Sequence, residues 1–390
     1  MDNVVIHSQI KSAGVRSLAG GGTKTLQLAF MITLSKMRGK PARDPYKPAL
    51  SGSMKPKSIT LHDVARAAGV SLITASRALG NPDRVSEATI ARVQQAVTET
   101  GYIPNLLAGG LKSRRSRTVA ALVPIISVPQ FLPTIEALTA ELDREGYQLI
   151  LGQMGYDRGR EEALLNAMAG RRVDGVVVAG LLSDIPAAHR LREIGIPVVE
   201  TWDLTERPLD MLVGFSHRQV GSAVAEFFLS KGWRNVGLAT GDDQRAAVRR
   251  AGFLETLGHD VPTAVVPAPS NVASGRRAAA ELFDQSPGLQ AIFCSADALA
   301  EGVLTEARVR GLRVPQDLAV CGFGGADFAA HLAPSLTTVQ IDGADIGAQA
   351  ARVLMARCRG EAPPEPVINV GFRIVEREST GAAAATWPGV

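Results

Sequence analysis

A run of nine residues, SLITASRAL, holds the side chains of this chain whose types and spacing best suit one kind of chemistry. Arg77 can donate two parallel hydrogen bonds to O6 and N7 of a guanine. The hydroxyl groups of Thr74 and Ser76 can donate to phosphate oxygens. Leu72 and Ile73 have no hydrogen-bonding groups and can contact only apolar surface, such as a thymine methyl group. Together these residues are typical of a surface that contacts DNA.

Short helices joined by a glycine turn must hold these side chains. Thr60, with an aspartate three residues later, is a loose capping box for a first helix, and Ser71 suits the N-cap of a second helix. Gly69 lies in the turn between them, and Ser86 caps a third helix. Two small helices around a glycine turn, with polar and basic residues on the second, predict a helix-turn-helix that places its second helix in the major groove.

Leu72 and Ile73 have an alternative role as core residues of the three-helix unit. Ala75 and Leu79 already supply an inward stripe on the same helix. The pattern therefore favours Leu72 and Ile73 as exposed residues that face DNA.

Charge is distributed unevenly along the 390 residues. Residues 1–53 hold 8 Lys and Arg against 2 Asp and Glu, and residues 54–117 hold 10 against 4. The remainder holds 24 basic and 32 acidic residues. A basic head on an acidic body is expected when only the head meets a polyanion.

Composition and motifs exclude several classes of protein. No stretch approaches the roughly 20 apolar residues of a membrane span, and no signal peptide is evident. Cys294, Cys321 and Cys358 are far apart and odd in number, which predicts free thiols in a reducing cytoplasm. No GxSxG, P-loop, HExxH or Cys/His metal spacing occurs, so we expect no enzyme, no cofactor and no metal site.

From residue 118 onward, β-rich apolar runs alternate with amphipathic segments in two blocks, roughly 118–215 and 217–340. This alternation predicts α/β lobes with parallel sheets wrapped by helices. A helical segment, 343–358, and one strand-like run, VINVGFRIV, follow. The pattern resembles the two-lobed periplasmic-binding-protein architecture, which holds a ligand in the cleft between its lobes.

The residues Thr60-Leu61-x-Asp63-Val64-Ala65, Gly69-Val70-Ser71, Thr74-x-Ser76-Arg77, Val85-Ser86 and Gly101-Tyr102-Ile103-Pro104-Asn105 resemble the signature of the lactose-repressor (LacI) family of bacterial regulators. The resemblance continues, more weakly, to about residue 377. Within that family, stretches such as RGREEALLNAMAGRRVDGVVV, IPVVETWD and AIFCSADALAEG are most similar to gluconate-utilisation repressors.

The resemblance and the composition together imply a domain organisation. It comprises a disordered extension (1–57), a helix-turn-helix domain (58–104), a hinge segment (105–117), an effector-binding and dimerisation domain (118–377) and a tail (378–390). Lobe one would hold about 118–215 and 341–366, and lobe two about 216–340 and 367–377, with chain crossings near residues 215, 340 and 367. Met37 and Met54 remain alternative start positions to Met1.

For DNA, the resemblance implies base contacts by Leu72, Ile73 and Arg77, and a hinge helix whose Leu111 wedges into the minor groove. Gly109 and Gly110 lie in that hinge, so either the hinge resists folding without DNA or the wedge is weak. The full set of expected DNA-binding residues is Thr60, Ser71, Leu72, Ile73, Thr74, Ser76, Arg77, Asn105, Leu111 and Lys112.

For the effector, the family's positions correspond to Phe131, Trp202, Arg245, Arg249, Ala296 or Asp297, and Gly324. Arg245 and Arg249 are four residues apart, so they share a helix face and can fork a carboxylate or phosphate. Phe131 and Trp202 could stack on a ligand. The alternatives are that Arg249 is a surface charge and Trp202 is ordinary core, and His217 is better explained as structural than as a catalytic base.

Two departures from sugar-binding relatives favour an acidic ligand. Gly324-Gly325 stands where those relatives carry a carboxylate, and Ala296 stands where they often have asparagine. We therefore expect a cytoplasmic homodimeric repressor, bound to double-stranded operator DNA and released by a sugar acid such as gluconate. The alternatives are a different sugar or phosphorylated sugar acid, an activator, or a solute-binding protein of transport.

Overall fold

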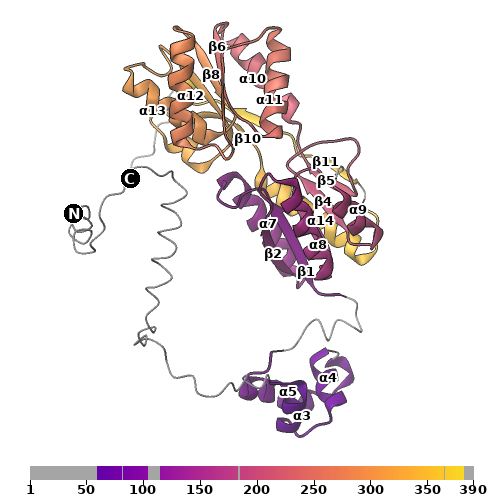
Figure 1. Cartoon of the computed structure of the whole chain (residues 1–390). Helices are drawn as coiled ribbons and strands as arrows, with labels where there is room; N and C mark the ends of the chain where they lie inside the picture. Colours follow the sequence, from indigo (N-terminus) through magenta and orange to yellow (C-terminus); the bar gives the residue numbers. More distant parts are fainter. Residues whose placement is uncertain (1–58, 81, 104–114, 183–184, 364, 382–390) are drawn as a thin grey trace, which may run out of the picture. The chain divides into compact units, whose positions relative to one another are not determined.

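The computed structural model describes residues 59–80, 82–103, 115–182, 185–363 and 365–381 (Figure 1). The chain forms two compact units, residues 1–103 and 104–390. The extension expected over 1–57, most of the hinge segment and the end of the tail lie outside the described residues.

The head consists of α3 (Leu61–Ala67), α4 (Leu72–Gly80) and α5 (Glu87–Thr100), with a short η1 (Pro82–Arg84). The Thr60 amide donates to the Asp63 carboxylate (2.9 Å), and the Thr74 amide donates to the Ser71 hydroxyl (3.1 Å). These two contacts begin α3 and α4, as their sequences predict. Gly69 has φ +62° in the turn between them. The predicted three-helix unit is confirmed.

The body holds two six-stranded sheets. Sheet A has the order β11-β5-β4-β3-β1-β2 and is parallel throughout. Its strands are β1 (Thr118–Val123), β2 (Gln148–Gln153), β3 (Gly175–Ala179), β4 (Val198–Thr201), β5 (Met211–Gly214) and β11 (Val367–Asn369). Sheet B has the order β12-β10-β9-β8-β6-β7, in which only β12 runs antiparallel to its neighbour. Its strands are β6 (Val236–Gly241), β7 (Thr263–Val266), β8 (Ala291–Cys294), β9 (Ala319–Gly324), β10 (Thr337–Gln340) and β12 (Arg373–Val375).

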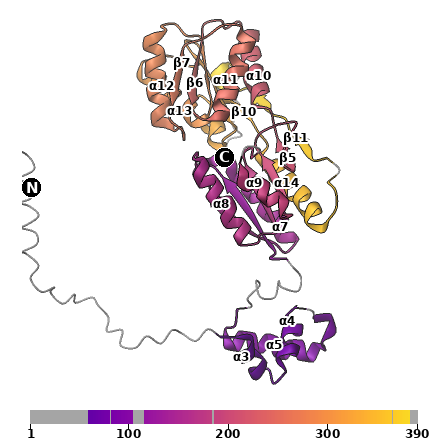
Figure 2. The same ribbon diagram turned by 45° about the vertical axis from the view of Figure 1, so that its right-hand side comes forward.

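Helices cover both faces of each sheet. In β1, Val119 and Ala121 belong to the apolar cluster of α7 and α14, whereas Ala120 and Leu122 face the cluster of α8 and α9. Sheet B has α12 and α13 on one side and α10 and α11 on the other (Figure 2). The helices are α7 (Leu132–Arg144), α8 (Arg158–Gly170), α9 (Pro186–Glu193), α10 (His217–Ser230), α11 (Gln244–Leu257), α12 (Val272–Gln285), α13 (Asp297–Val309) and α14 (Gly343–Arg359). Burial on both faces explains the continuous apolar runs of the strands.

The run VINVGFRIV forms two strands, contrary to the single strand expected. Residues 367–369 are β11 and pair with β5 in lobe one, whereas 373–375 are β12 and pair with β10 in lobe two. The assignment of residues 367–369 to lobe two was therefore wrong, and the chain crosses between the sheets after Asn369. Gly371, with φ +67°, breaks the extended backbone there. An alternating apolar pattern does not distinguish one strand from two that continue into different sheets.

Two further features concern the described part of the chain alone. None of its helices is both long and apolar enough to cross a membrane. Its three cysteines, Cys294, Cys321 and Cys358, are free thiols. Lobe one is the sheet A half of the body, and lobe two is the sheet B half.

Candidate functional site

The outer face of α4 presents the expected DNA-reading side chains. Ala75 and Ala78 are buried against the other helices of the head, so the opposite face of α4 points outward. Leu72 is 36% exposed and Ile73 is 62% exposed. The alternative in which these two residues form the core is therefore wrong. The inward stripe holds Ala75 and partly buried Leu79, as expected, together with Ala78.

The polar side chains of the head divide into two groups. The hydroxyl groups of Ser71 and Thr74 contact each other (2.8 Å), and that of Thr60 donates to Asp63 (2.7 Å), so these three begin helices. Ser76 and Arg77 are exposed, and the Arg77 guanidinium has no hydrogen bond or ion pair within the described residues. Arg77 is thus free to donate to a base. Asn105, Leu111 and Lys112 lie outside the described residues.

The two expected aromatic residues of the effector site are packed core in this structure. Trp202 is 1% exposed, and its ring meets Phe131 and Phe215 edge-on at centroid distances of 5.1 and 5.9 Å. Its indole N–H donates to the Thr134 hydroxyl (3.1 Å). Trp202 has φ +67°, a strained backbone conformation for any residue other than glycine. Such strained residues are often found at functional sites. Trp202 is therefore a core residue here, which was the alternative to a role in stacking on a ligand.

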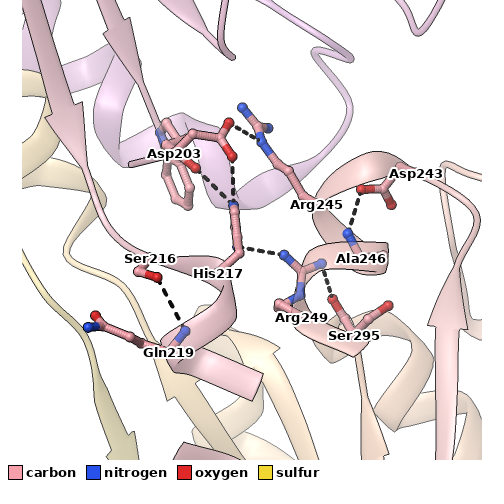
Figure 3. Close-up of polar contacts among 10 residues, drawn as sticks. Asp203, Ser216, His217, Gln219, Asp243, Arg245, Ala246, Arg249 and Ser295 are labelled. Atoms are coloured by element: carbon pink, nitrogen blue, oxygen red, sulfur yellow. Dashed lines mark hydrogen bonds and ion pairs between the residues drawn. The ribbon is translucent and has the colours of Figure 1, made fainter. Parts of the chain in front are cut away.

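Arg249, on α11, is buried rather than a surface charge, with 4% of it exposed. Its Nη1 donates to Nδ1 of His217 (2.8 Å), and its Nη2 donates to the carbonyl of Ser295 (3.2 Å) (Figure 3). The guanidinium carbon lies 4.0 Å from the ring centroid of Phe323. Burial lowers the pKa of Arg249 to about 10, so the side chain remains protonated at neutral pH.

His217 links Arg249 to the backbone of lobe one. An arginine can only donate, so Nδ1 of His217 accepts and Nε2–H donates to the carbonyl of Trp202 (2.9 Å). Burial, together with the charges of Arg249 and Arg245, holds the pKa of His217 well below its usual range. A neutral histidine with both nitrogens engaged is a structural residue, as the sequence favoured.

Arg245 is paired with a carboxylate that the sequence analysis missed. Its Nε donates to Oδ2 of Asp203 (2.7 Å), and Oδ1 of Asp203 lies 3.4 Å from Nε2 of His217 (Figure 3). Asp203 follows β4 in lobe one, whereas Arg245 belongs to α11 in lobe two. Burial raises the pKa of Asp203, and Arg245 opposes that effect. The position of Asp203 just after a buried strand was the signal in the sequence, because ligands of such sheets bind beyond the carboxyl ends of their strands.

Asp297 and Gly324 form a separate corner of the site. Oδ1 of Asp297 accepts from the Thr338 hydroxyl (2.6 Å), and Oδ2 accepts from the amide of Ala326 (2.7 Å). One carboxylate oxygen therefore holds β10 and the other holds the segment after β9. A side chain added at Gly324 would come within 3.5 Å of Asp297 and 3.4 Å of Gln130, a lobe-one residue that the sequence analysis also missed. Ala296 precedes Asp297 as the N-cap of α13.

The arginine cluster retains unused hydrogen-bonding capacity. Among the described residues, two buried side-chain nitrogens have no hydrogen-bond partner, Nη2 of Arg245 and Nε of Arg249. A buried donor without an acceptor costs about 1–3 kcal/mol. These two donors would be satisfied by acceptor oxygens, such as those of a carboxylate.

Comparison with known proteins gives matches over both units. The family described as bacterial regulatory proteins, lacI family, matches residues 60–105, and the periplasmic binding protein-like domain matches residues 225–380. The HTH-type transcriptional regulator GntR of Pseudomonas aeruginosa is 35% identical over 330 residues, covering 82% of this chain and 95% of that protein. GntR of Escherichia coli is 31% identical over 325 residues, covering 82% and 98%.

Solved structures agree with these matches. A LacI-family regulator from Silicibacter pomeroyi superposes with a TM-score of 0.78 at 33% identity, covering 83% of this chain and 99% of that chain. GntR from Chromobacterium violaceum gives 0.65 at 34% identity, covering 68% and 100%. The lac repressor dimer bound to operator gives 0.71 at 22% identity over 84% of this chain and all of that one, which supports the fold alone.

Proposed function

This chain belongs to the LacI family of bacterial regulatory proteins, and we propose that a sugar acid such as gluconate, bound beside Arg245 and Arg249, releases it from its operator. Its relatives over most of its length are HTH-type transcriptional regulators. The chain is therefore a DNA-binding regulator of transcription and not an enzyme. The alternative of a transport solute-binding protein lacks any explanation for the helix-turn-helix head.

The observation that carries the proposed ligand class is the pair of buried donors without partners. Nη2 of Arg245 and Nε of Arg249 project from one helix, four residues apart, and both side chains are cationic. A carboxylate oxygen accepts a charge-assisted hydrogen bond from a guanidinium N–H, so an acidic ligand suits either of these donors. A neutral sugar has hydroxyl groups, which make weaker hydrogen bonds to a guanidinium than a carboxylate does.

Asp203 sets a condition on this ligand. Because Asp203 already holds Nε of Arg245 at 2.7 Å, an acidic effector must share Arg245 with it or displace it. Displacement would break a hydrogen bond between the two lobes, which links binding to their arrangement. We propose this exchange of carboxylates as the first event of induction.

Calorimetry tests the ligand class. Gluconate, gluconate 6-phosphate, 2-ketogluconate and glucose are titrated into the full-length protein and into Arg245→Ala and Arg249→Ala. We expect at least one acid to bind more tightly than glucose, and each substitution to weaken that acid by about 2–5 kcal/mol, the cost of truncating one partner of a desolvated charge pair. Arg250→Ala, the next residue on α11, is the matched control and should bind as wild type does.

Arg249 also supports His217, so the thermal stability of each variant is measured beside its affinity. Tighter binding of glucose than of every acid would contradict the proposed ligand class. So would acid binding that is indifferent to both substitutions in folded variants. The acid that binds most tightly is then titrated into the complex of protein and operator. This measurement shows whether the acid weakens or strengthens operator binding.

We further propose a cytoplasmic homodimer on a near-palindromic operator. One helix-turn-helix head reads few base pairs, so regulators of this kind use two heads on two half-sites. Within this complex, Leu72, Ile73 and Arg77 would contact bases, and Ser76 would contact phosphate. Leu111 would open the minor groove at the centre, with Asn105 and Lys112 nearby in the hinge segment.

A further inference from the structure

Helix α14 connects the candidate effector site to the point where the hinge segment joins the body. At its N-terminal end, the Thr134 hydroxyl donates to the carbonyl of Gly343 (2.8 Å) and accepts from the indole N–H of Trp202 (3.1 Å). Trp202 immediately precedes Asp203, the residue that pairs with Arg245. One peptide unit and two hydrogen bonds therefore connect the Asp203–Arg245 pair to α14.

The other end of α14 holds the last residues of the hinge segment. Nη2 of Arg115 donates to the carbonyl of Cys358 (2.8 Å), one of the final carbonyls of the helix. The Cys358 thiol in turn donates to the carbonyl of Asp174 (3.3 Å). The Asp174 carboxylate accepts from the amides of Ser116 (2.8 Å) and Arg117 (2.9 Å). This small network sets where residues 115–117 leave the body.

Packing makes α14 a stiff connector over most of its length. Its 17 residues span about 25 Å at 1.5 Å per residue. A side chain at Gly347 would meet the backbone oxygen of Thr134 at 2.3 Å, so α14 and α7 are in backbone contact. A side chain at Gly175 would meet the Leu354 side chain at 2.8 Å, so Leu354 of α14 packs directly on the backbone of β3.

The last turn of α14 is packed differently. Met355, Cys358 and Arg359 border a cavity of about 170 Å³, whose other walls include Arg115 and Tyr147. The last turn therefore has fewer packed neighbours on this side than the middle of the helix, where Gly347 and Leu354 contact α7 and β3. If Gly343 moved, we would therefore expect the carbonyl of Cys358, in the last turn of the helix, to move with it.

We propose that α14 transmits the effector signal to the hinge segment, and that Thr134 and Arg115 are the positioning residues at its two ends. The proposal rests on the proposed function for the identity of the signal, but not for the coupling itself. Ligand-induced movement of Trp202 shifts α14 through Thr134. The shift changes the Arg115–Cys358 hydrogen bond and, with it, the anchorage of residues 115–117.

Hydrogen exchange tests the coupling without any ligand. Thr134→Val in the full-length protein keeps the side-chain shape and removes both hydrogen bonds at the N-terminal end of α14. We expect faster exchange, by at least threefold, at the amides of Ser116 and Arg117, which are at the opposite end of the helix. Thr139→Val, on the same helix α7, is the matched control, because its hydroxyl bonds only within α7 and exchange at 116–117 should not change. Unchanged exchange in folded Thr134→Val would overturn the proposal.

Operator binding with and without gluconate tests the signal. Effector couplings of this kind change affinity about 5- to 150-fold. We expect Arg115→Ala to bind gluconate within threefold of wild type but to retain less than a third of the wild-type change in operator affinity. Arg352→Ala, an exposed arginine on α14, should retain all of it. A full change in operator affinity in Arg115→Ala would overturn the proposal. If no sugar acid changes the operator affinity of wild type, the proposed function is wrong instead. The exchange experiment would still decide the coupling in that case.

Discussion

At the scale of single residues, the head and the body use arginine in opposite ways. Arg77 is exposed and unpaired within the described residues, whereas Arg249 is buried, bonded to His217 and Ser295, and stacked on Phe323. An exposed guanidinium with free donors is available to a base edge. A buried one is held in a single orientation, so its remaining donor can discriminate between ligands.

Arg77→Ala should flatten discrimination at one guanine in each half-site. The lost bidentate contact is worth about 1–3 kcal/mol of preference for the correct base. The measurement is fluorescence anisotropy of the full-length protein on operator, single-base variants and random duplex at one salt concentration. Arg92→Ala, an exposed arginine on α5, is the control of equal charge and should keep the base preference. Equal weakening on operator and random DNA by Arg77→Ala would show that α4 does not read bases.

His217 should make the protein less stable in acid. Its folded-state pKa is depressed below the usual 6.5 by burial and by Arg249 and Arg245, with Asp203 also in contact. Below about pH 6.5 the unfolded chain therefore binds a proton that the folded chain does not, so the free energy of unfolding falls as pH falls, by up to about 1.4 kcal/mol per pH unit. His217→Gln keeps a donor and an acceptor but does not titrate. Urea unfolding at pH 7.5, 6.5 and 5.5 should show wild type losing stability relative to this variant, and a constant difference would contradict a neutral buried histidine.

At the scale of elements, pairs of helices are held in backbone contact by glycine. On α10, a side chain at Gly221 would meet the carbonyl oxygen of Arg249 at 1.9 Å, and on α11 a side chain at Gly252 would meet that of Arg218 at 2.1 Å. This close packing positions α11, which carries both arginines of the candidate site.

Gly252→Ala should push α10 and α11 apart. Overpacking of this kind costs about 1–3 kcal/mol, and the displaced α11 should also weaken effector binding. Gly170→Ala on α8 is the matched control, because nothing lies within 4 Å of its added methyl group. That change should be neutral or should stabilise the protein by up to about 1 kcal/mol, since alanine favours a helix over glycine. Urea unfolding and calorimetry check both variants, and equal stability of the two would contradict the proposed contact.

At the scale of the whole molecule, DNA recognition depends on how many heads meet one operator. We expect sedimentation at micromolar concentration to give two chains per particle. We expect an operator with one half-site destroyed to bind roughly 10²–10⁴ times more weakly than the intact operator, because the second head then loses the benefit of being tethered to the first. A monomer that binds one half-site as tightly as two would contradict the homodimer.

The sequence alone was sufficient for the family, the helix-turn-helix head and the α/β class of the body, all confirmed by the structure and the relatives. Each depends on patterns that neighbouring residues create. Ser71 caps α4 because its hydroxyl accepts from the amide of Thr74, three residues later. The strands of the two sheets are continuous apolar runs because helices cover both faces of each sheet. The same kind of pattern was not sufficient for VINVGFRIV, because alternation carries no information on which sheet each half joins.

The candidate effector site shows what only the tertiary structure decided. The spacing of Arg245 and Arg249 predicted a shared helix face, but the partner of Arg245 is Asp203, 42 residues earlier in the chain and in the other lobe. The packing of Trp202 in the core depends on Thr134, and the hydrogen bonding of Asp297 depends on Thr338, both of them far away in sequence. Local hydrogen bonds and periodicity follow from residues three or four apart, whereas a buried charge finds its partner only when the lobes have folded.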